Sequence, residues 1–497
     1  MGNKLPKNWE IVPLEAVGEN KYYAIGDGDH GKIKPSMYQD NGIPYIRVSD
    51  IDWGYFKKEK LVYISEEVHN INLKSELVPG DVLIAKTGAT IGKCCIVPKY
   101  IEKANTTSSV GKVSINKALT SSKWVLYYFL SSEFFKLMWS HSNRTAQPGF
   151  NNIDLKKFPL PLPPIAEQER IIAKLDALFA QHEAMKKALE RIPQLLKDFR
   201  QQVLTQALTG RLTEEWREGE KLNAYSFEEL DKFREEVKSV QANKITRSKL
   251  IYKKSSEVKL GENTKGIESL YNIPKSWLWV NLDQVTWNIS DGPHFSPKYV
   301  LENEGKKFIS MRNVGVNGID FSDCKYVSID DHNQFIKRGK PEVGDLVYTK
   351  GGSTGIACVL DTDVDFSYWV HLALLKVVKK AANPTFLRNA LNSPMCYKQS
   401  QAFTHGVGNQ DLGLTRMIYI TFPLPPLTEQ NEIVSRVGSL FAKADKIEEK
   451  YKVLKARLAT LPQAILHKAF KGGLVAQLPT DGDARGLLQQ IKKLKIK

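Results

Sequence analysis

The chain has 497 residues, of which 42% are hydrophobic and 25% are charged, an ordinary mixture for a protein of two to four globular domains. No apolar run is long enough to span a membrane and no apolar signal core stands near the first residue, so we expect a cytoplasmic protein. Five cysteines without a CxxC pair argue against a zinc site and a disulfide framework, and a formal charge of +16 indicates a polyanionic partner, nucleic acid before membrane.

Residues 1–157 are predicted to form a first globular domain. Its landmarks are an Asp27-Gly28-Asp29-His30 loop, a short apolar strand at Tyr45–Val48, and a Gly-Asp turn that feeds a buried strand ending at Lys86. The loop Gly88–Lys93 resembles a phosphate-binding loop, but it has three residues between its glycines where the motif has four. We therefore do not expect a nucleotide there.

Residues 158–212 are predicted to form a first long helical spacer. The PLPP segment at Pro161–Pro164 starts a helix in which apolar residues step by 4 and 3, the pattern of a coiled-coil seam. A stop signal at Gly210 limits this helix to roughly 42 residues, or about 60 Å at 1.5 Å per residue. Because Pro193 lies inside the pattern, we expect the helix to kink or break there.

Residues 213–270 read as a polar connector with one modest helix at Phe227–Val240. A second globular domain follows at residues 271–419. It repeats the landmarks of the first, with Asp291-Gly292-Pro293-His294 in place of the first loop and another Gly-Asp turn before a strand that ends at Lys350. The same scaffold with different loops is what two readers of two different ligands require.

Residues 420–478 are a second long helical spacer, and residues 479–497 form a C-terminal tail. PLPPLTEQNEIVSRVGSLFA from Pro423 aligns without a gap with PLPPIAEQERIIAKLDALFA from Pro161, 262 residues earlier. Pro462 again predicts a kink. The whole unit of domain plus helix is therefore duplicated. The predicted seam consists of Ile171, Leu175, Leu178, Met185, Leu196, Phe199, Ile433, Val437, Leu440, Ile447, Leu458 and Leu461, and two such helices can bury each other.

A search for methyltransferase, zinc-protease and nuclease motifs finds none. Asn383-Pro384-Thr385-Phe386 is similar to the catalytic loop of adenine methyltransferases, but its second proline and a glycine-rich cofactor loop are missing, so we predict a helix start there. The chain contains no HExxH and no nuclease-like acidic cluster. It is predicted to bind rather than to catalyse.

The duplicated PLPPxxEQxxI segment, the two DGxH loops and the tract from Ile192 to Glu218 resemble the specificity subunit of type I restriction-modification enzymes, in particular type IA. The resemblance implies an α+β fold: two target recognition domains with mixed sheets and short helices, joined by two long helices packed as an antiparallel coiled coil. It implies a non-catalytic chain that binds double-stranded DNA, two modification subunits with S-adenosylmethionine, and two restriction subunits with ATP and Mg²⁺.

Two helices packed antiparallel are related by a two-fold axis, so their domains would read two unlike half-sites of DNA in opposite orientations. At 3.4 Å per base pair, a rod of about 60 Å limits the full site to roughly 17 base pairs. Amide-bearing and cationic residues in the loops are the candidate DNA contacts. They are His30, Lys34, Lys86, Arg144, Gln147, His294, Lys298, Lys350, Asn409 and Gln410, with His182 and Ala444 as packing or register positions on the seams.

Two other functions stay open on the residues alone. A self-contained modifying enzyme would need a cofactor motif that the sequence lacks. A structural protein that dimerises through its coiled coil would show no preference for DNA.

Overall fold

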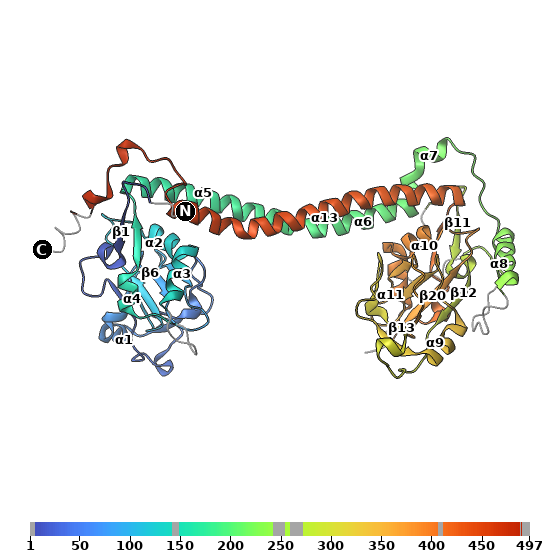
Figure 1. The fold of residues 1–497 in the computed structure, drawn as a ribbon, viewed down its shortest axis with the longest axis horizontal. Coiled ribbons are helices and arrows are strands. Elements are labelled where there is room, and N and C mark those ends of the chain that lie inside the picture. The colour runs from blue at the N-terminus through green and yellow to red at the C-terminus, as the bar shows by residue number, and fades with distance from the viewer. Residues whose placement is uncertain are drawn as a thin grey trace. The chain divides into compact units, whose positions relative to one another are not determined.

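The structure, a computed structural model, describes residues 5–141, 149–241, 254–258, 272–405, 411–487 and 489. The chain divides into two compact units, Met1–Glu190 with Tyr451–Lys497, and Arg191–Lys450. Each unit combines one globular domain with stretches of two long helices that are distant in sequence (Figure 1). The end of the second long helix therefore belongs to the unit of the first domain.

Two four-stranded sheets form the centre of the first domain. One has the order β2 (Ile25–Asp27), β9 (Val110–Val113), β6 (Val82–Ala85), β7 (Cys94–Ile96), and the other β4 (Val62–Ile64), β3 (Ile43–Ile46), β8 (Ala104–Thr106), β5 (Glu76–Leu77). β3 and β8 are parallel while β3 and β4 are antiparallel, so the predicted mixed sheet is confirmed. β6 is buried along its whole length because all four of its residues are apolar.

The first and last strands of the first domain pair with each other. β1 (Glu10–Pro13) pairs antiparallel with β10 (Pro159–Leu162), directly before the first long helix. The described residues of this domain also form four short α-helices: α1 (Glu66–Ile71), α2 (Ser122–Phe129), α3 (Ser132–Ser140) and α4 (Asn152–Lys157). Trp124 of α2 is fully buried in the main apolar core, which links this helix to the sheet.

The second domain repeats this topology. Its central sheet has the order β12 (Thr286–Asp291), β20 (Leu372–Val377), β17 (Leu346–Thr349), β18 (Ala357–Val359). The smaller sheet is β16 (Lys325–Ser328), β13 (Gly305–Ile309), β19 (Phe366–Tyr368), and the closing pair is β11 (Leu278–Asn281) with β21 (Thr421–Leu424). A two-stranded ribbon, β14 (Val314–Gly315) with β15 (Gly318–Ile319), is added. The helices are α9 (Ile329–Phe335), α10 (Pro384–Leu391), α11 (Pro394–Phe403) and α12 (Leu414–Met417).

The two prolines in the long helices have different effects. The first spacer is interrupted next to Pro193, between α5 (Ile165–Glu190) and α6 (Ile192–Leu208). The second spacer is one helix, α13 (Leu427–Phe470), which continues through Pro462, so this helix does not break at its proline. After α6, the connector contains α7 (Glu214–Glu218) and α8 (Phe227–Gln241), which confirms the predicted connector helix.

The long helices pair in opposite directions within each unit. In the first unit, Arg170 near the start of α5 binds Asp481, which follows α13 in the chain, and His182 further along binds the backbone of Leu458 in α13. In the second unit, Arg200 of α6 forms ion pairs with α13, and later along the first spacer the carbonyl of Leu212 accepts a hydrogen bond from Arg436. The partner's residue number falls as the first spacer advances in each unit, so the antiparallel pairing is confirmed.

Burial does not follow the predicted seam along its whole length. Ile171 and Leu175 are buried against the first domain, and Ile433 and Val437 against the second. Partial burial is found for Leu178 and Leu461 against the first core and for Leu440 against the second. Elsewhere on the long helices, Leu196 is buried and Leu458 is half-buried. Met185, Phe199 and Ile447 are 45%, 37% and 50% exposed, so the prediction that they are buried is wrong. In a pair of helices only the side chains that point directly at the facing helix are enclosed, and those at the edge of the contact stay exposed to solvent. No helix in the described ranges is long and apolar enough to cross a membrane.

Candidate nucleic-acid interface

The DGxH loop of the first domain starts at the end of β2 with a buried ion pair. The Lys86 ammonium, which follows β6, donates a hydrogen bond of 2.7 Å to Asp27 and one of 2.9 Å to Asn152 at the start of α4. Burial by itself would raise the pKa of the Asp27 carboxyl, but the hydrogen bonds from Lys86 and Asn152 outweigh burial and hold this pKa below its ordinary value. The charged pair therefore ties the loop to the sheet and to α4.

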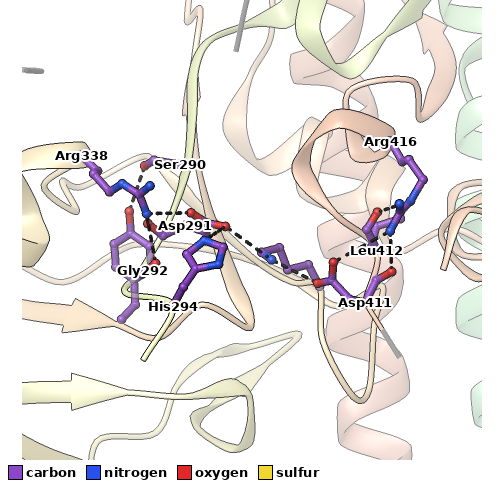
Figure 2. Close-up of polar contacts among 10 residues, drawn as sticks. Ser290, Asp291, Gly292, His294, Arg338, Asp411, Leu412 and Arg416 are labelled. Atoms are coloured by element: carbon purple, nitrogen blue, oxygen red, sulfur yellow. Dashed lines mark hydrogen bonds and ion pairs between the residues drawn. The ribbon is translucent and has the colours of Figure 1, made fainter. Parts of the chain in front are cut away.

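The second domain carries an enlarged version of the same ion pair, shown in Figure 2. Asp291 at the end of β12 lies 3.5 Å from the Lys350 ammonium and 3.1 Å from the Arg338 guanidinium. Arg338 also donates to the carbonyl of Gly292 at 3.2 Å, and Lys350 donates to Asp411 at 3.1 Å. Asp291 therefore has two cationic partners, whereas Asp27 has a single lysine and a histidine that is charged only when protonated.

The glycine of each loop is required by close backbone packing. A methyl group added to Gly28 would lie 1.9 Å from the carbonyl oxygen of Thr106, and one added to Gly292 would lie 1.8 Å from that of Tyr368. Real carbon atoms do not approach an oxygen so closely, so no larger residue fits without moving the adjacent strand. This packing holds the first loop against the end of β8 and the second against the end of β19.

Each histidine of the motif is exposed while its partner carboxylate is buried. His30 Nε2 lies 3.0 Å from Asp27 and His294 Nε2 lies 3.1 Å from Asp291. Their side chains are 54% and 60% exposed. His30 has a φ of 56°, in the left-handed region, and Tyr45 donates a hydrogen bond of 2.8 Å to Asp29 beside it. With Nε2 bonded to the aspartate, Nδ1 is the nitrogen that can bond to a ligand.

The predicted DNA contacts lie in three different environments. Lys34 and Lys298 are exposed a few residues after the histidines. Lys86 and Lys350 are 4% and 3% exposed and are bound to carboxylates, so their charge is already neutralised inside the protein. Arg144, Gln147, Asn409 and Gln410 lie outside the described residues. The exposed histidines and lysines are therefore the predicted contacts that the described structure leaves accessible.

The glutamate of the repeated Glu-Gln pair holds each domain to the long helices. Glu429, which is completely buried, accepts hydrogen bonds of 2.7 Å from Thr213, 2.9 Å from Arg217 and 2.7 Å from the Trp277 indole. It thereby joins the start of α13 to the end of the first spacer and to the entry of the second domain. These three hydrogen bonds add to the favourable interaction between a carboxylate in the first turn and the helix dipole.

The first unit contains the equivalent joint with neutral partners. Glu167 is also completely buried and accepts hydrogen bonds of 2.9 Å from Asn8 and 3.0 Å from Gln477. The adjacent Gln168 accepts from Thr120 at 2.8 Å, next to the start of α2. The repeated sequence therefore marks a joint of three segments in each unit: domain entry, helix start and the end of the other spacer.

Several of these residues are absent from the sequence-based prediction. Arg338 and Asp411 complete the second cluster, yet neither has a counterpart at the repeat offset that would single it out. His69 of α1 and His332 of α9 are both 2% exposed and sit 263 positions apart. Both histidines end a Tyr-x-Ser-x-x-x-His segment. This repeated segment could have identified them from the sequence.

The chemistry of these clusters is that of binding. Each presents an exposed imidazole and nearby exposed lysines on a loop that buried ions hold in place. Across the described ranges, no three His, Cys, Asp or Glu side chains gather in a way that could hold a metal ion. Asn383 caps α10 by accepting hydrogen bonds from the backbone of Thr385 and Phe386, which confirms the predicted helix start.

Comparisons with known proteins agree with this duplicated architecture. The chain is 26% identical over 516 residues to the EcoKI specificity subunit of Escherichia coli K12, covering 98% of this chain and 96% of that one. It is 27% identical over 502 residues to the EcoBI specificity subunit of Escherichia coli, covering 98% and 92%. Such subunits are DNA-recognition components rather than catalytic ones.

Solved structures show the same fold. The HsdS subunit of Thermoanaerobacter tengcongensis superposes with a TM-score of 0.57 at 19% identity, covering 95% of this chain and 98% of that one. A chain from a structure of a type I R-M system superposes with a TM-score of 0.60 at 19% identity, covering 95% and 100%. The type I restriction modification DNA specificity domain matches residues 6–194 and again residues 274–456. The chain therefore belongs to the specificity subunits of type I restriction-modification enzymes.

Proposed function

We propose that this subunit reads a bipartite, asymmetric DNA site, with one half-site for each globular domain. The main support is the repetition of the whole reading unit: the order β2-β9-β6-β7 recurs as β12-β20-β17-β18, and a DGxH cluster recurs at the equivalent strand end. In this proposal residues 1–157 and 271–419 are the target recognition domains, and residues 158–212 and 420–478 are the spacers. The connector at 213–270 and the tail at 479–497 read no bases.

The DGxH loops contact the DNA backbone in this proposal. Two domains that read different sequences share the same histidine, aspartate and glycine, and phosphate is the part of DNA that all sequences share. When protonated, His30 and His294 each donate the Nδ1 hydrogen to a phosphate, and Lys34 and Lys298 neutralise neighbouring phosphates. Lys86 and Lys350 position the loops through their buried carboxylates. Base reading falls to loops that differ between the domains, including those of Arg144, Gln147, Asn409 and Gln410.

Partner subunits dock on the helix pair in this proposal. Exposed apolar side chains cluster toward the middle of the spacers: Met185, Val453 and Leu454 in the first unit, and Leu195, Phe199 and Ile447 in the second. Apolar positions of this kind mark protein contact sites when they gather on one element. Two modification subunits, which carry S-adenosylmethionine, bind there, and two restriction subunits add ATP- and Mg²⁺-dependent translocation and cleavage. The specificity subunit positions both kinds on the DNA.

A domain exchange tests the bipartite reading. We expect that replacing residues 1–157 by the corresponding domain of another family member changes one half of the methylated site and leaves the other half intact. Replacing residues 271–419 instead is the matched control, and it should change only the opposite half. Sequencing of methylated bases in a host with the partner subunits reads out both. If either exchange altered both halves, or neither half, the two-reader proposal would fail.

The phosphate role has a separate test. At a pH low enough to protonate the histidines, the variants His30→Ala and His294→Ala should weaken binding to specific and unrelated DNA by the same factor, and each should lower the dependence of affinity on salt by about one ion. Binding titrations at several salt concentrations measure both. A change of preferred base in either variant would assign the histidine to base reading instead.

A further inference from the structure

Pro462 removes one hydrogen bond from the middle of a helix that nevertheless continues. In an α-helix the N–H of residue 462 would bond to the carbonyl of residue 458, but proline has no N–H. α13 runs without interruption from Leu427 to Phe470. The Leu458 carbonyl therefore needs a donor from outside its own helix, because an unpaired, partly buried carbonyl is unfavourable.

His182 of the antiparallel helix α5 supplies that donor. Its Nε2 lies 3.0 Å from the Leu458 carbonyl oxygen. A carbonyl oxygen can only accept, so Nε2 carries the hydrogen. The histidine side chain is 13% exposed, which limits access of water to this bond. The contact thus replaces, across the two helices, the bond that the proline has removed.

The second unit offers a comparison in which both partners are different. With the gap-free offset of 262 residues, His182 corresponds to Ala444, Leu458 to Leu196, and Pro462 to Arg200. Arg200 lies inside α6 and has a backbone N–H for the carbonyl of residue 196. Ala444 and Leu196 are 1% and 7% exposed. Where the helix keeps its own bond, the opposite helix carries a small side chain without a donor.

We propose that His182 is a positioning residue matched to Pro462, whose hydrogen bond to Leu458 keeps α13 continuous and sets its register against α5. The polar contact has a single acceptor in the interior of the opposite helix, since before its last turn only the carbonyl four residues before the proline lacks its helical donor. Apolar side chains along the pair pack in several neighbouring registers, whereas this bond forms in one. The consequence for spacing of the two half-sites rests on the proposed function.

A set of four variants tests the hydrogen bond in the full chain. His182→Ala removes the donor, His182→Gln keeps an amide that can donate, Pro462→Arg restores the helical N–H, and His182→Ala with Pro462→Arg copies the second unit. The measurement is amide hydrogen exchange, followed by mass spectrometry, over residues 455–466. We expect exchange to be about tenfold faster in His182→Ala, and near the wild-type rate in the other three.

The register is tested separately with the partner subunits present. The readout is the ratio of methylation rates on DNA with the natural spacer and with a spacer one base pair longer. We expect His182→Ala to lose part of this discrimination and the double variant to regain it.

The outcomes distinguish the proposals. Unchanged exchange in His182→Ala, or fast exchange that the double variant fails to slow, overturns the matched hydrogen bond. Restored exchange with unchanged spacer discrimination throughout overturns the positioning role. A wild-type protein without any spacer discrimination overturns the bipartite reading instead, while the exchange data still decide the hydrogen bond.

Discussion

Removal of the Lys86 ammonium is expected to be among the most damaging substitutions in the first domain. Lys86→Met keeps the length and much of the volume of the side chain, but it leaves the Asp27 carboxylate, 5% exposed, without the lysine that pairs with it. The neighbouring His30 is exposed and offers a full charge only when protonated. Breaking a buried ion pair by removal of one partner costs about 3–5 kcal/mol, so we expect a loss in this range.

The second domain supplies the matched comparison. Lys350→Met removes the equivalent ammonium, but Asp291 retains the Arg338 guanidinium at 3.1 Å. The remaining charge keeps the carboxylate paired, so we expect a smaller loss, about 1–2 kcal/mol. The difference between the two variants therefore reports whether a second cation protects the loop.

Thermal unfolding combined with hydrogen exchange measures this difference. The first unit contains Met1–Glu190 with Tyr451–Lys497, and for a unit of this size a loss of 3 kcal/mol lowers the unfolding midpoint by about 6–12 °C. Exchange should accelerate mainly in the loop that contains Asp27. Hydrogen bonds from Lys86 and Asn152 hold the pKa of Asp27 below its ordinary value despite burial. The stabilisation is therefore present above the pKa of an unfolded aspartate and is lost as pH falls through the folded pKa.

Equal losses in Lys86→Met and Lys350→Met would refute this reasoning. A Lys86→Met variant as stable as the wild type at neutral pH would also refute it. So would a difference in the free energy of unfolding between Lys86→Met and the wild type that grows as the pH falls.

Three further predictions follow from the same structure. Gly28→Ala should destabilise the first domain by several kcal/mol or prevent folding, because its methyl group would lie 1.9 Å from a carbonyl oxygen. Gly438→Ala is the control, because a methyl group there meets no neighbouring atom on α13. Chemical denaturation should show that this variant is more stable by about 0.5–1 kcal/mol. Glu429→Ala should cost more stability than Glu167→Ala, because it leaves the Arg217 guanidinium, which is 19% exposed, without its carboxylate; equal midpoints in thermal unfolding would contradict this. Insertion of one heptad into both spacers should lengthen the tolerated DNA spacer, and sequencing of methylated sites with unchanged spacing would count against the rod as a ruler.

Local sequence patterns predicted much of the fold. The gap-free repeat from Pro161 to Pro423 predicted the duplication, and the structure reproduces it strand by strand. Apolar runs before Lys86 and Lys350 predicted buried strands, which appear as β6 and β17. These predictions succeed because burial on both faces leaves a continuous apolar run in the sequence itself.

The candidate site was less predictable. The DGxH loops are visible as repeated residues, but the sequence does not show that Lys86 and Lys350 are buried beneath them rather than exposed to DNA. A lysine after a strand is usually exposed, and only the position of Asp27 or Asp291 on a neighbouring part of the sheet reverses that expectation. Arg338 reaches the second loop from a segment that shares no motif with it.

The sequence by itself determined the duplication, the antiparallel-compatible helices and the family, because each of these is written in spacing along the chain. The tertiary structure alone decided which proline interrupts a helix. In the sequence, Pro193 and Pro462 each remove one helical hydrogen bond. Pro462 nevertheless lies in a continuous helix, where His182 from the opposite helix bonds to the Leu458 carbonyl that the proline leaves without a donor. A missing hydrogen bond is a local property, but its replacement depends on which distant residue the fold brings within 3.0 Å.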